Sequence, residues 1–395
     1  MDSVFVHRGS ETAILGSGRL QGLRVALQPN LSVAGWPTDA GSRALADFKA
    51  LEDATIVGRL RQAGACLCGS TRMSEFGFGL ENSQAGEALR TKTADLELVL
   101  DLMGESRLAA ARAGVCGLKP SYGLLSRLGL VGLVPSMECC GLLAADVARI
   151  RDTLQAIAGK DDLDFSLPDE EPSDLAPRAI EPRRTTLGLV GEAQGTLSAE
   201  RDKAFRAAVG KLAAAGFAIK RLSMPDFPLF SLVHRIVGSV EASSCAGRYD
   251  SVRYGRRVPG ARNWNEMYLT ARGAAFGSHL KSYLLSGAFF QFERYQAFEN
   301  ACRIRARLLS EMRRLTAQVD ALVSPAVGPV DLGAPPSLAE TYAGFASTLF
   351  ANVTGQPALV LPAADVAIQL VGARRGDGLL LALGERLLGI VKGGS

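Results

Sequence analysis

Cysteine and histidine side chains are the first candidates for chemistry in this sequence, because both bind metals and both can act in catalysis. Cys66 and Cys68 form a Cys-x-Cys pair in an apolar run. His7, His234 and His279 lie far apart in the chain, with no cysteine or carboxylate at ligand spacing. We therefore expect no metal site and no cofactor, and we interpret the seven cysteines as reduced, mostly buried thiols.

Acidic side chains offer a second kind of chemistry. Glu81, Glu87 and Glu105 could supply a pair of carboxylates for acid/base catalysis of the glycosidase type. Carboxylates scattered along a loop are usually solvated, however, so we favour a structural or surface role for them.

Arginines and tyrosines gather in residues 248–262 (RYDSVRYGRRVPGAR), which hold five arginines and two tyrosines. Such a mixture can follow an RNA backbone and stack on bases. The candidate RNA contacts are Arg248, Arg253, Arg256 and Arg257. Asp250 reduces the local charge, so a purely structural role for this stretch is the alternative.

The composition of the chain describes a folded protein rather than a disordered one. Its 395 residues are 47% hydrophobic and 21% charged, which allows one large or two ordinary domains. The net charge of +4 is too small to indicate a nucleic-acid or membrane partner by itself. Without an apolar run of transmembrane length or a secretory signal pattern, we expect no membrane insertion and a soluble intracellular protein, in the cytoplasm or an organelle matrix.

The hydrophobic pattern predicts the elements that must position these side chains. Strand, helix and strand follow one another over 23–69 and again over 187–222, as in units that build parallel sheets. Asp53 is the predicted N-cap of the helix in the first unit. The remaining predicted elements are helices over 147–157 and 289–319, a strand over 320–325 and a surface loop over 167–184.

Four motifs in this order resemble the amidase signature family. They are residues 32–43 (SVAGWPTDAGSR), 53–64 (DATIVGRLRQAG), 71–76 (TRMSEF) and 116–123 (CGLKPSYG). Residues 121–132, 248–255 and 352–362 further resemble the branch that holds the A subunits of glutamine-dependent Asp/Glu-tRNA amidotransferases. The resemblance implies a single α/β domain over 1–395, with a mixed, mostly parallel sheet covered by helices on both faces. The family's N-terminal helical segment is largely missing.

The resemblance also implies a catalytic serine, a bridging serine and a lysine base, and this sequence departs from the family at these positions. Gln28 stands at the lysine position, and an amide cannot accept a proton near neutral pH. Glu105 stands at the nucleophile position, and Ser83 is the only serine in a shortened loop where the bridging serine belongs. Ser106 is an alternative nucleophile, but the one-residue shift that it requires breaks the match at Arg107.

The family's glutamine-binding charges are also replaced. Ser282 and Tyr283 stand at the position of an arginine pair, and Phe345 stands at the position of an aspartate. We therefore expect that this chain does not bind the charged ends of glutamine.

These departures favour an inactive, amidase-like pseudoenzyme that serves as a structural or regulatory subunit of a hetero-oligomeric assembly. The alternative is an active glutamine-hydrolysing subunit of a tRNA amidotransferase, or a free amidase. A second alternative is a small-molecule binding module that uses the vestigial cleft. We expect the shortened loop after Phe76 to leave apolar surface that a partner covers.

Overall fold

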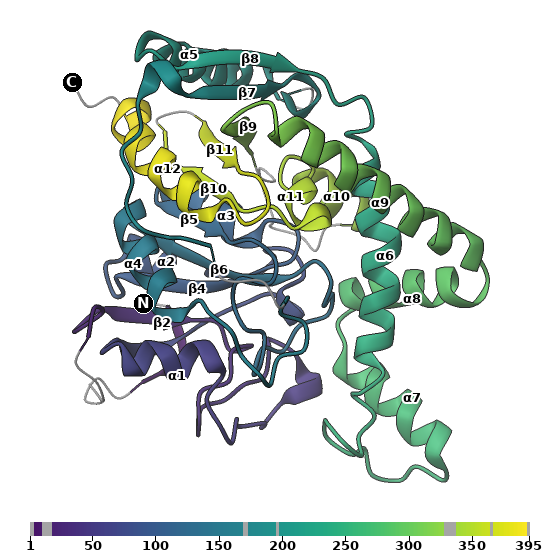
Figure 1. Ribbon diagram of the computed structural model, residues 1–395. Coiled ribbons are helices and arrows are strands. Elements are labelled where there is room, and N and C mark those ends of the chain that lie inside the picture. The colour runs from purple at the N-terminus through teal and green to yellow at the C-terminus, as the bar shows by residue number, and fades with distance from the viewer. Residues whose placement is uncertain are drawn as a thin grey trace.

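One large β-sheet runs through the molecule (Figure 1). The computed structural model describes residues 4–9, 18–168, 173–194, 197–327, 337–363 and 366–392. Within these residues eleven strands form the sheet in the order β1-β3-β2-β4-β6-β5-β10-β11-β9-β7-β8. Their bounds are β1 Phe5–Arg8, β2 Arg24–Leu27, β3 Cys66–Thr71, β4 Leu96–Asp101, β5 Cys116–Lys119, β6 Cys139–Ala144, β7 Thr186–Val190, β8 Ala218–Leu222, β9 Ala321–Ala326, β10 Ala358–Leu361 and β11 Ala367–Val371.

The predicted α/β class and mixed sheet are confirmed, but the sheet is not mostly parallel as predicted. Four of the described strand pairs are parallel and six are antiparallel. The parallel pairs include β2 with β3 and β7 with β8, which are the two predicted strand-helix-strand units. The central strands β5, β6, β10 and β11 pair antiparallel, because loops rather than crossover helices join β5 to β6 and β10 to β11.

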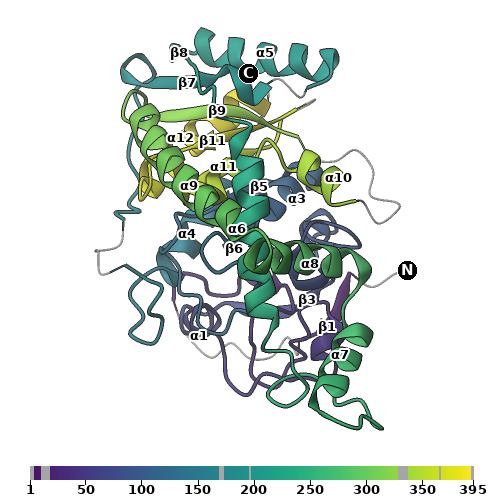
Figure 2. The same cartoon turned by 90° about the vertical axis from the view of Figure 1, so that its right-hand side faces the viewer.

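Helices cover both faces of the sheet (Figures 1 and 2). Apolar residues of α1, α4, α5 and α12 form one buried cluster, and those of α3, α6, α8, α9 and α11 form a second. Strand β4 supplies both clusters, with Leu98 in the first and Val99 in the second, as alternation along a strand requires. The helices are α1 Thr55–Gln62, α2 Glu87–Arg90, α3 Glu105–Ala113, α4 Val147–Ile157, α5 Ala199–Ala214, α6 Leu229–Ala246, α7 Trp264–Ala275, α8 Ser278–Phe292, α9 Tyr295–Thr316, α10 Leu338–Gly344, α11 Leu349–Thr354 and α12 Asp377–Lys392.

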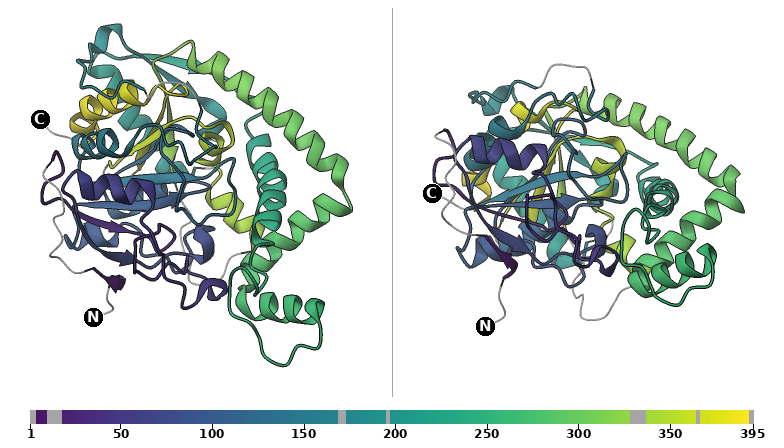
Figure 3. Two further views of the ribbon diagram at one scale, coloured as in Figure 1. Left: turned by 60° about the horizontal axis from the view of Figure 1, so that its bottom comes forward. Right: turned by 90° about the horizontal axis from the view of Figure 1, so that it is seen from below.

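The helix predicted over 147–157 is confirmed as α4, while two other helix predictions need correction. Asp53 is not the N-cap of α1, because its carboxylate accepts a hydrogen bond from the Ala34 N–H (2.8 Å) and pairs with Arg61. The long helix predicted over 289–319 is two helices. Arg294 leaves the helical conformation, so the chain turns and α8 and α9 meet at an angle, with α6 between them (Figure 3).

The predicted loop over 167–184 lies partly outside the described residues, since 169–172 are not among them. Its described part has no regular structure before a short 3-10 helix at Pro182–Arg184. Among the described helices, none combines the length and the apolar character that crossing a membrane requires.

The prediction of exposed apolar surface at the shortened loop is wrong. Phe76, Phe78 and Leu80 are 0%, 2% and 5% exposed, because they pack into the cluster beneath α6 and α8. The exposed apolar side chains lie elsewhere, including Leu285 and Phe292 on α8.

Candidate active site

The candidate active site lies where β4 ends and α3 begins. Residues 102–104 form the tight turn between them, and Glu105 is the first residue of α3. Gly104 has a φ of +130°, and a Cβ at this position would collide with the Thr348 hydroxyl. The turn therefore requires glycine, and it aligns the backbone N–H groups that precede the helix.

These N–H groups surround the carboxylate of Glu105. Its Oε2 accepts hydrogen bonds from the N–H groups of Leu102 (2.7 Å), Met103 (2.7 Å) and Gly104 (3.1 Å). Its Oε1 accepts a fourth bond from the Gly79 N–H (3.1 Å). Consecutive N–H groups at such distances form an anion cradle, which is the arrangement that stabilises a developing oxyanion in acyl transfer.

Burial and a neighbouring charge act on Glu105 together. The residue is 2% exposed, and burial, with repulsion from Asp101, raises the pKa of Glu105 to about 7. The backbone N–H bonds act in the opposite direction and favour the carboxylate. The four N–H bonds therefore offset part of the cost of burying the Glu105 charge.

Gln28 lies at the same end of β4. It is 3% exposed, and its Oε1 accepts a hydrogen bond from the Leu100 N–H (2.9 Å). The structure thus brings Gln28 and Glu105 to one strand end. Ser83 lies in the turn after Leu80, where its hydroxyl accepts a bond from the Ala85 N–H (3.2 Å).

Ser106 faces away from the cradle into the core. It is fully buried, and its hydroxyl donates to Asp101 Oδ2 (2.5 Å). A Cβ on Gly141 of β6 would collide with this hydroxyl, so strand and serine are in close contact. This geometry gives Ser106 a structural role under the sheet and no path to a substrate.

The polar cluster around Asp101 is a feature that the sequence did not predict. Arg107 and Asp101 are fully buried and form an ion pair (2.9 Å). Arg107 also donates to Gln369 Oε1 (2.7 Å), and Asn352 donates to Asp101 Oδ1 (2.9 Å). These residues come from β4, α3, α11 and β11, so only the tertiary fold brings them together. An arginine and an aspartate six residues apart gave no signal of this cluster.

Aromatic side chains and a histidine pack beside the cradle. His234 Nε2 lies 3.0 Å from the Leu102 carbonyl, and its Nδ1 lies 3.0 Å from the Tyr342 hydroxyl. Tyr342 donates to the Tyr283 hydroxyl (3.3 Å), and the Tyr283 ring stacks on Phe78 at 4.2 Å. Burial lowers the pKa of His234 to about 4, so its imidazole is neutral at physiological pH.

These aromatic residues occupy the region where the sequence lacks the family's glutamine-binding charges. Tyr283 and Phe345 are 0% and 1% exposed. The glycosidase-type pair is not assembled either. Glu87 forms a surface ion pair with Arg90 (2.7 Å), whereas Glu105 is buried among backbone N–H groups.

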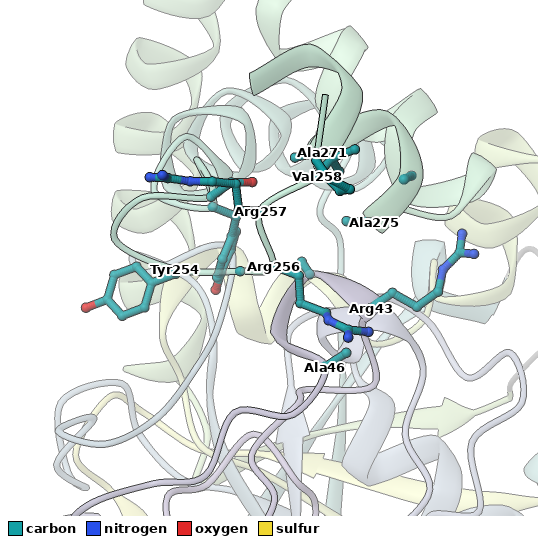
Figure 4. A pocket seen from close by; sticks show the side chains of 14 residues that line it. Arg43, Ala46, Tyr254, Arg256, Arg257, Val258, Ala271 and Ala275 are labelled. Atoms are coloured by element: carbon teal, nitrogen blue, oxygen red, sulfur yellow. The ribbon is translucent and has the colours of Figure 1, made fainter. Parts of the chain in front are cut away.

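The four arginines proposed to contact RNA do not share one environment. Arg248 donates to the Cys245 carbonyl (3.0 Å), and Arg253 pairs with Asp250 (2.8 Å). Arg256 and Arg257 line a surface pocket, which is shown in Figure 4. RNA contact through all four therefore stays a prediction.

Comparisons with known proteins identify the family. The chain matches the Amidase family over residues 10–88 and 101–381. The A subunit of glutamyl-tRNA(Gln) amidotransferase from Natronomonas pharaonis is 34% identical over 94% of this chain and 96% of its own length. The chloroplastic/mitochondrial A subunit of the same enzyme from Oryza sativa subsp. indica is 30% identical over 93% of this chain and 76% of its own length.

Solved structures share the fold. The A subunit of glutamyl-tRNA(Gln) amidotransferase from Thermotoga maritima superposes with a TM-score of 0.78 at 23% identity, covering 96% of this chain and 85% of that one. A 6-aminohexanoate cyclic dimer hydrolase gives the same TM-score at 20% identity, covering 98% and 89%. The matched residues and the shared fold show that this chain belongs to the Amidase family.

Proposed function

We propose that this chain is an amidase-family protein that does not hydrolyse amides and instead serves as a structural or regulatory subunit of a protein complex. The observation that carries the proposal is the Glu105 carboxylate, which accepts four backbone N–H bonds at the nucleophile position. A protein that cradles its own carboxylate there offers a substrate neither a hydroxyl nor free oxyanion donors.

The size of the expected loss of transition-state stabilisation follows from what the donors of an oxyanion hole contribute. One such donor stabilises the transition state of acyl transfer by about 3 to 4 kcal/mol. The Glu105 carboxylate accepts the N–H groups of Leu102, Met103 and Gly104, so a tetrahedral intermediate would have to displace a buried side chain first. A second anion in the same cradle would also repel the first.

The base position supports the same proposal. Gln28 uses its Oε1 to accept the Leu100 N–H, and an amide has no titration near neutral pH. His234, a further buried group close to the cradle, has its pKa lowered to about 4 and is held by Leu102 and Tyr342. It is a weak base that contacts no serine hydroxyl within the described residues.

A partner protein is supported by the outer face of α8. Leu285, Phe289 and Phe292 follow one another at helical spacing and are 70%, 48% and 75% exposed. The opposite face of the helix is packed tightly on α6, where a Cβ on Gly287 would collide with the Ser239 carbonyl. The helix is thus firmly held while an apolar stripe remains in water, as is typical of an interface.

The second candidate is an active glutamine-hydrolysing subunit of a tRNA amidotransferase, and the comparisons favour it over the first. Relatives that are 34% and 33% identical over 94% and 93% of this chain are glutamyl-tRNA(Gln) amidotransferase A subunits. This likeness argues for a similar assembly and activity, whereas the contacts of Glu105 and Gln28 argue against the activity.

Ammonia release from glutamine, asparagine and an aryl amide separates the two candidates. It should be measured for the chain alone and for any complex purified with it from its native source. The proposal predicts background rates for the wild type and for Glu105→Ser, because a serine hydroxyl there still lacks a base. Ser106→Ala is the control for a misplaced nucleophile. Turnover by the wild-type complex that Ser106→Ala abolishes would establish the second candidate.

The subunit role needs its own test. Mass spectrometry of the natively purified protein should recover a stoichiometric partner, and Phe292→Asp should weaken its retention. Phe165→Asp is a matched control, because Phe165 is 96% exposed and lies outside α8. A soluble monomer with no partner, unaffected by Phe292→Asp, would refute the subunit role.

A further inference from the structure

The sheet has a free edge at β8, which six strands separate from β4 and the candidate active site. Figure 1 shows β8 at the top margin of the molecule, as the last strand after β9 and β7. Among the described strands it pairs with β7 alone, in a regular register without a bulge. Three of its five residues are exposed, whereas four of the five residues of β7 are buried. An exposed, regular edge of this kind can accept a further strand.

The register of β7 and β8 determines which backbone groups face this edge. The N–H of Ala218 donates to the Thr185 carbonyl (3.0 Å), so the N–H and C=O groups of every second residue of β8 point toward β7. The groups of Ile219 and Arg221 therefore point outward, and they have no hydrogen-bond partner among the described residues. Two N–H and two C=O groups are thus open to a strand that lies alongside.

The side chains of residues 219–222 follow the order apolar, basic, basic, apolar. Ile219 and Leu222 are half-buried and pack on the two apolar clusters, on opposite faces of the sheet. Lys220 and Arg221 are exposed and lie one on each face. Lys220 donates to Gln318 Oε1 (3.0 Å), and neither basic side chain forms an ion pair within the described part of the chain. The edge therefore carries two positive charges that no carboxylate compensates.

The neighbouring sequence adds to this positive charge. Residues 203–225 contain five basic residues and no acidic one. Glu192 contacts the segment beyond the end of β8, where it accepts the Ser223 hydroxyl (2.6 Å). A second copy of β8 on this edge would place like charges side by side, which is unfavourable in a sheet. An acidic strand would instead pair each of the two basic side chains with an opposite charge.

We propose that the β8 edge binds an extended acidic segment of a partner protein, which adds a strand to the sheet. The acidic residues of the segment lie beside Lys220 and Arg221, and its apolar residues lie beside the other two side chains. The order apolar, acidic, acidic, apolar reads the same in both directions, so it fits a parallel or an antiparallel strand. The inference goes beyond the proposed function, because it involves neither Glu105 nor the apolar stripe of α8.

Fluorescence anisotropy of a labelled peptide with the sequence GTVEEVTG tests the proposal on the full-length protein. We expect saturable binding that weakens as salt is added. Two control peptides should bind more weakly by about tenfold or more. GTVKKVTG reverses the charge, and GTVEEVTG methylated on the backbone nitrogens of its four central residues keeps the charge but cannot pair with a strand. Absence of saturable binding, or equal binding of the methylated peptide, would overturn the proposal.

Variants of the protein locate the binding. The double variant Lys220→Glu, Arg221→Glu should bind GTVKKVTG in place of GTVEEVTG. The matched control Arg303→Glu, Arg313→Glu changes the net charge equally on the exposed face of α9 and should keep the wild-type preference. Arg221→Pro should weaken binding about fivefold more than Arg221→Ala, because proline also removes an outward N–H. Unchanged melting temperatures establish that the variants fold. A wild-type preference in the β8 double variant, or equal affinities of the proline and alanine variants, would contradict the proposed pairing.

Amide hydrogen exchange measured by NMR gives a readout that does not depend on charge. The Ile219 and Arg221 amides should exchange rapidly in the free protein and slowly when GTVEEVTG is bound, while the Ala218 amide is protected in both states. Unchanged exchange of the two outward amides in the peptide complex would refute the added strand. Slow exchange in the free protein that becomes rapid on dilution would assign the edge to a second copy of this chain and would also overturn the proposal.

Discussion

Two buried carboxylates hold the loop that follows Phe76, and the pKa of one of them leads to a prediction about how stability depends on pH. Glu97 on β4 is fully buried, where it accepts the Thr71 hydroxyl (2.8 Å) and the Gly86 N–H (2.8 Å). Glu105 holds Gly79 at the other end of the same segment. Burial, with a smaller effect from Glu87, raises the pKa of Glu97 from 4.5 to about 7.

The sign of the effect follows from this shift. A carboxyl group whose pKa is raised on folding leaves stability unaffected below pH 4.5 and lowers it increasingly as the pH rises toward 7. The interval from 4.5 to about 7, at about 1.4 kcal/mol per pH unit, corresponds to a penalty of about 3 kcal/mol above neutrality. Glu97→Gln should remove it, because the amide can accept the Gly86 N–H and donate to the Thr71 hydroxyl.

Denaturant unfolding of the wild type and of Glu97→Gln between pH 5 and pH 8 measures this penalty. The variant should gain stability over the wild type as the pH rises, from about 1 kcal/mol at pH 5 to about 3 kcal/mol at pH 8. Subtracting the two free energies of unfolding cancels the contributions of the other titrating groups, because both proteins share them. Glu181→Gln is the control, since this side chain is 68% exposed and should give a flat difference. A Glu97→Gln difference that is independent of pH would refute the reasoning.

Three further predictions concern the buried Asp101–Arg107 pair, the candidate active site and the cysteines. Arg107→Ala should lower the free energy of unfolding by about 3 to 5 kcal/mol, because it leaves the Asp101 charge buried and unpaired, whereas the exposed Arg303→Ala should be nearly neutral; equal melting temperatures would contradict this. Glu105→Ser with Gln28→Lys should accept a fluorophosphonate label faster than Glu105→Ser alone, and equal labelling would argue that Gln28 does not stand at the base position. Cys302 is exposed and should react first with a thiol reagent, while Cys139, whose pKa burial raises to about 12, should react only on unfolding; early loss of the Cys139 thiol in mass spectra would count against its burial.

Local patterns in the sequence were sufficient for part of the fold. The period of apolar residues predicted α4 with its observed ends, and the strand-helix-strand units predicted the parallel pairs at β2–β3 and β7–β8. The antiparallel centre was missed because a short buried strand has the same apolar pattern in either direction. The break at Arg294 was missed for a related reason. The residues around it have ordinary helix propensities, and the chain turns there because α8 and α9 both pack on α6.

The candidate site was predicted only as far as the resemblance could place positions. Gln28 and Glu105 were identified as departures, and the structure brings them to one end of β4. What Glu105 does there could not be inferred, because its partners are backbone N–H groups, which every sequence contains. The approach of His234 was likewise not predicted, since its contact with Leu102 joins segments 132 residues apart.

The contacts of Glu105 connect the stability of this fold with its proposed loss of activity. A tight turn before a helix exposes several N–H groups in one direction, and in a buried site each needs an acceptor. In an active amidase the acceptor would be water or the substrate oxygen. The same cavity would then both bind the substrate and satisfy the N–H donors of the turn. Here the Glu105 carboxylate satisfies these N–H donors permanently. Selection for a folded subunit can therefore keep Gly104 and the turn around it without any requirement for catalysis, and the turn alone is not evidence of activity.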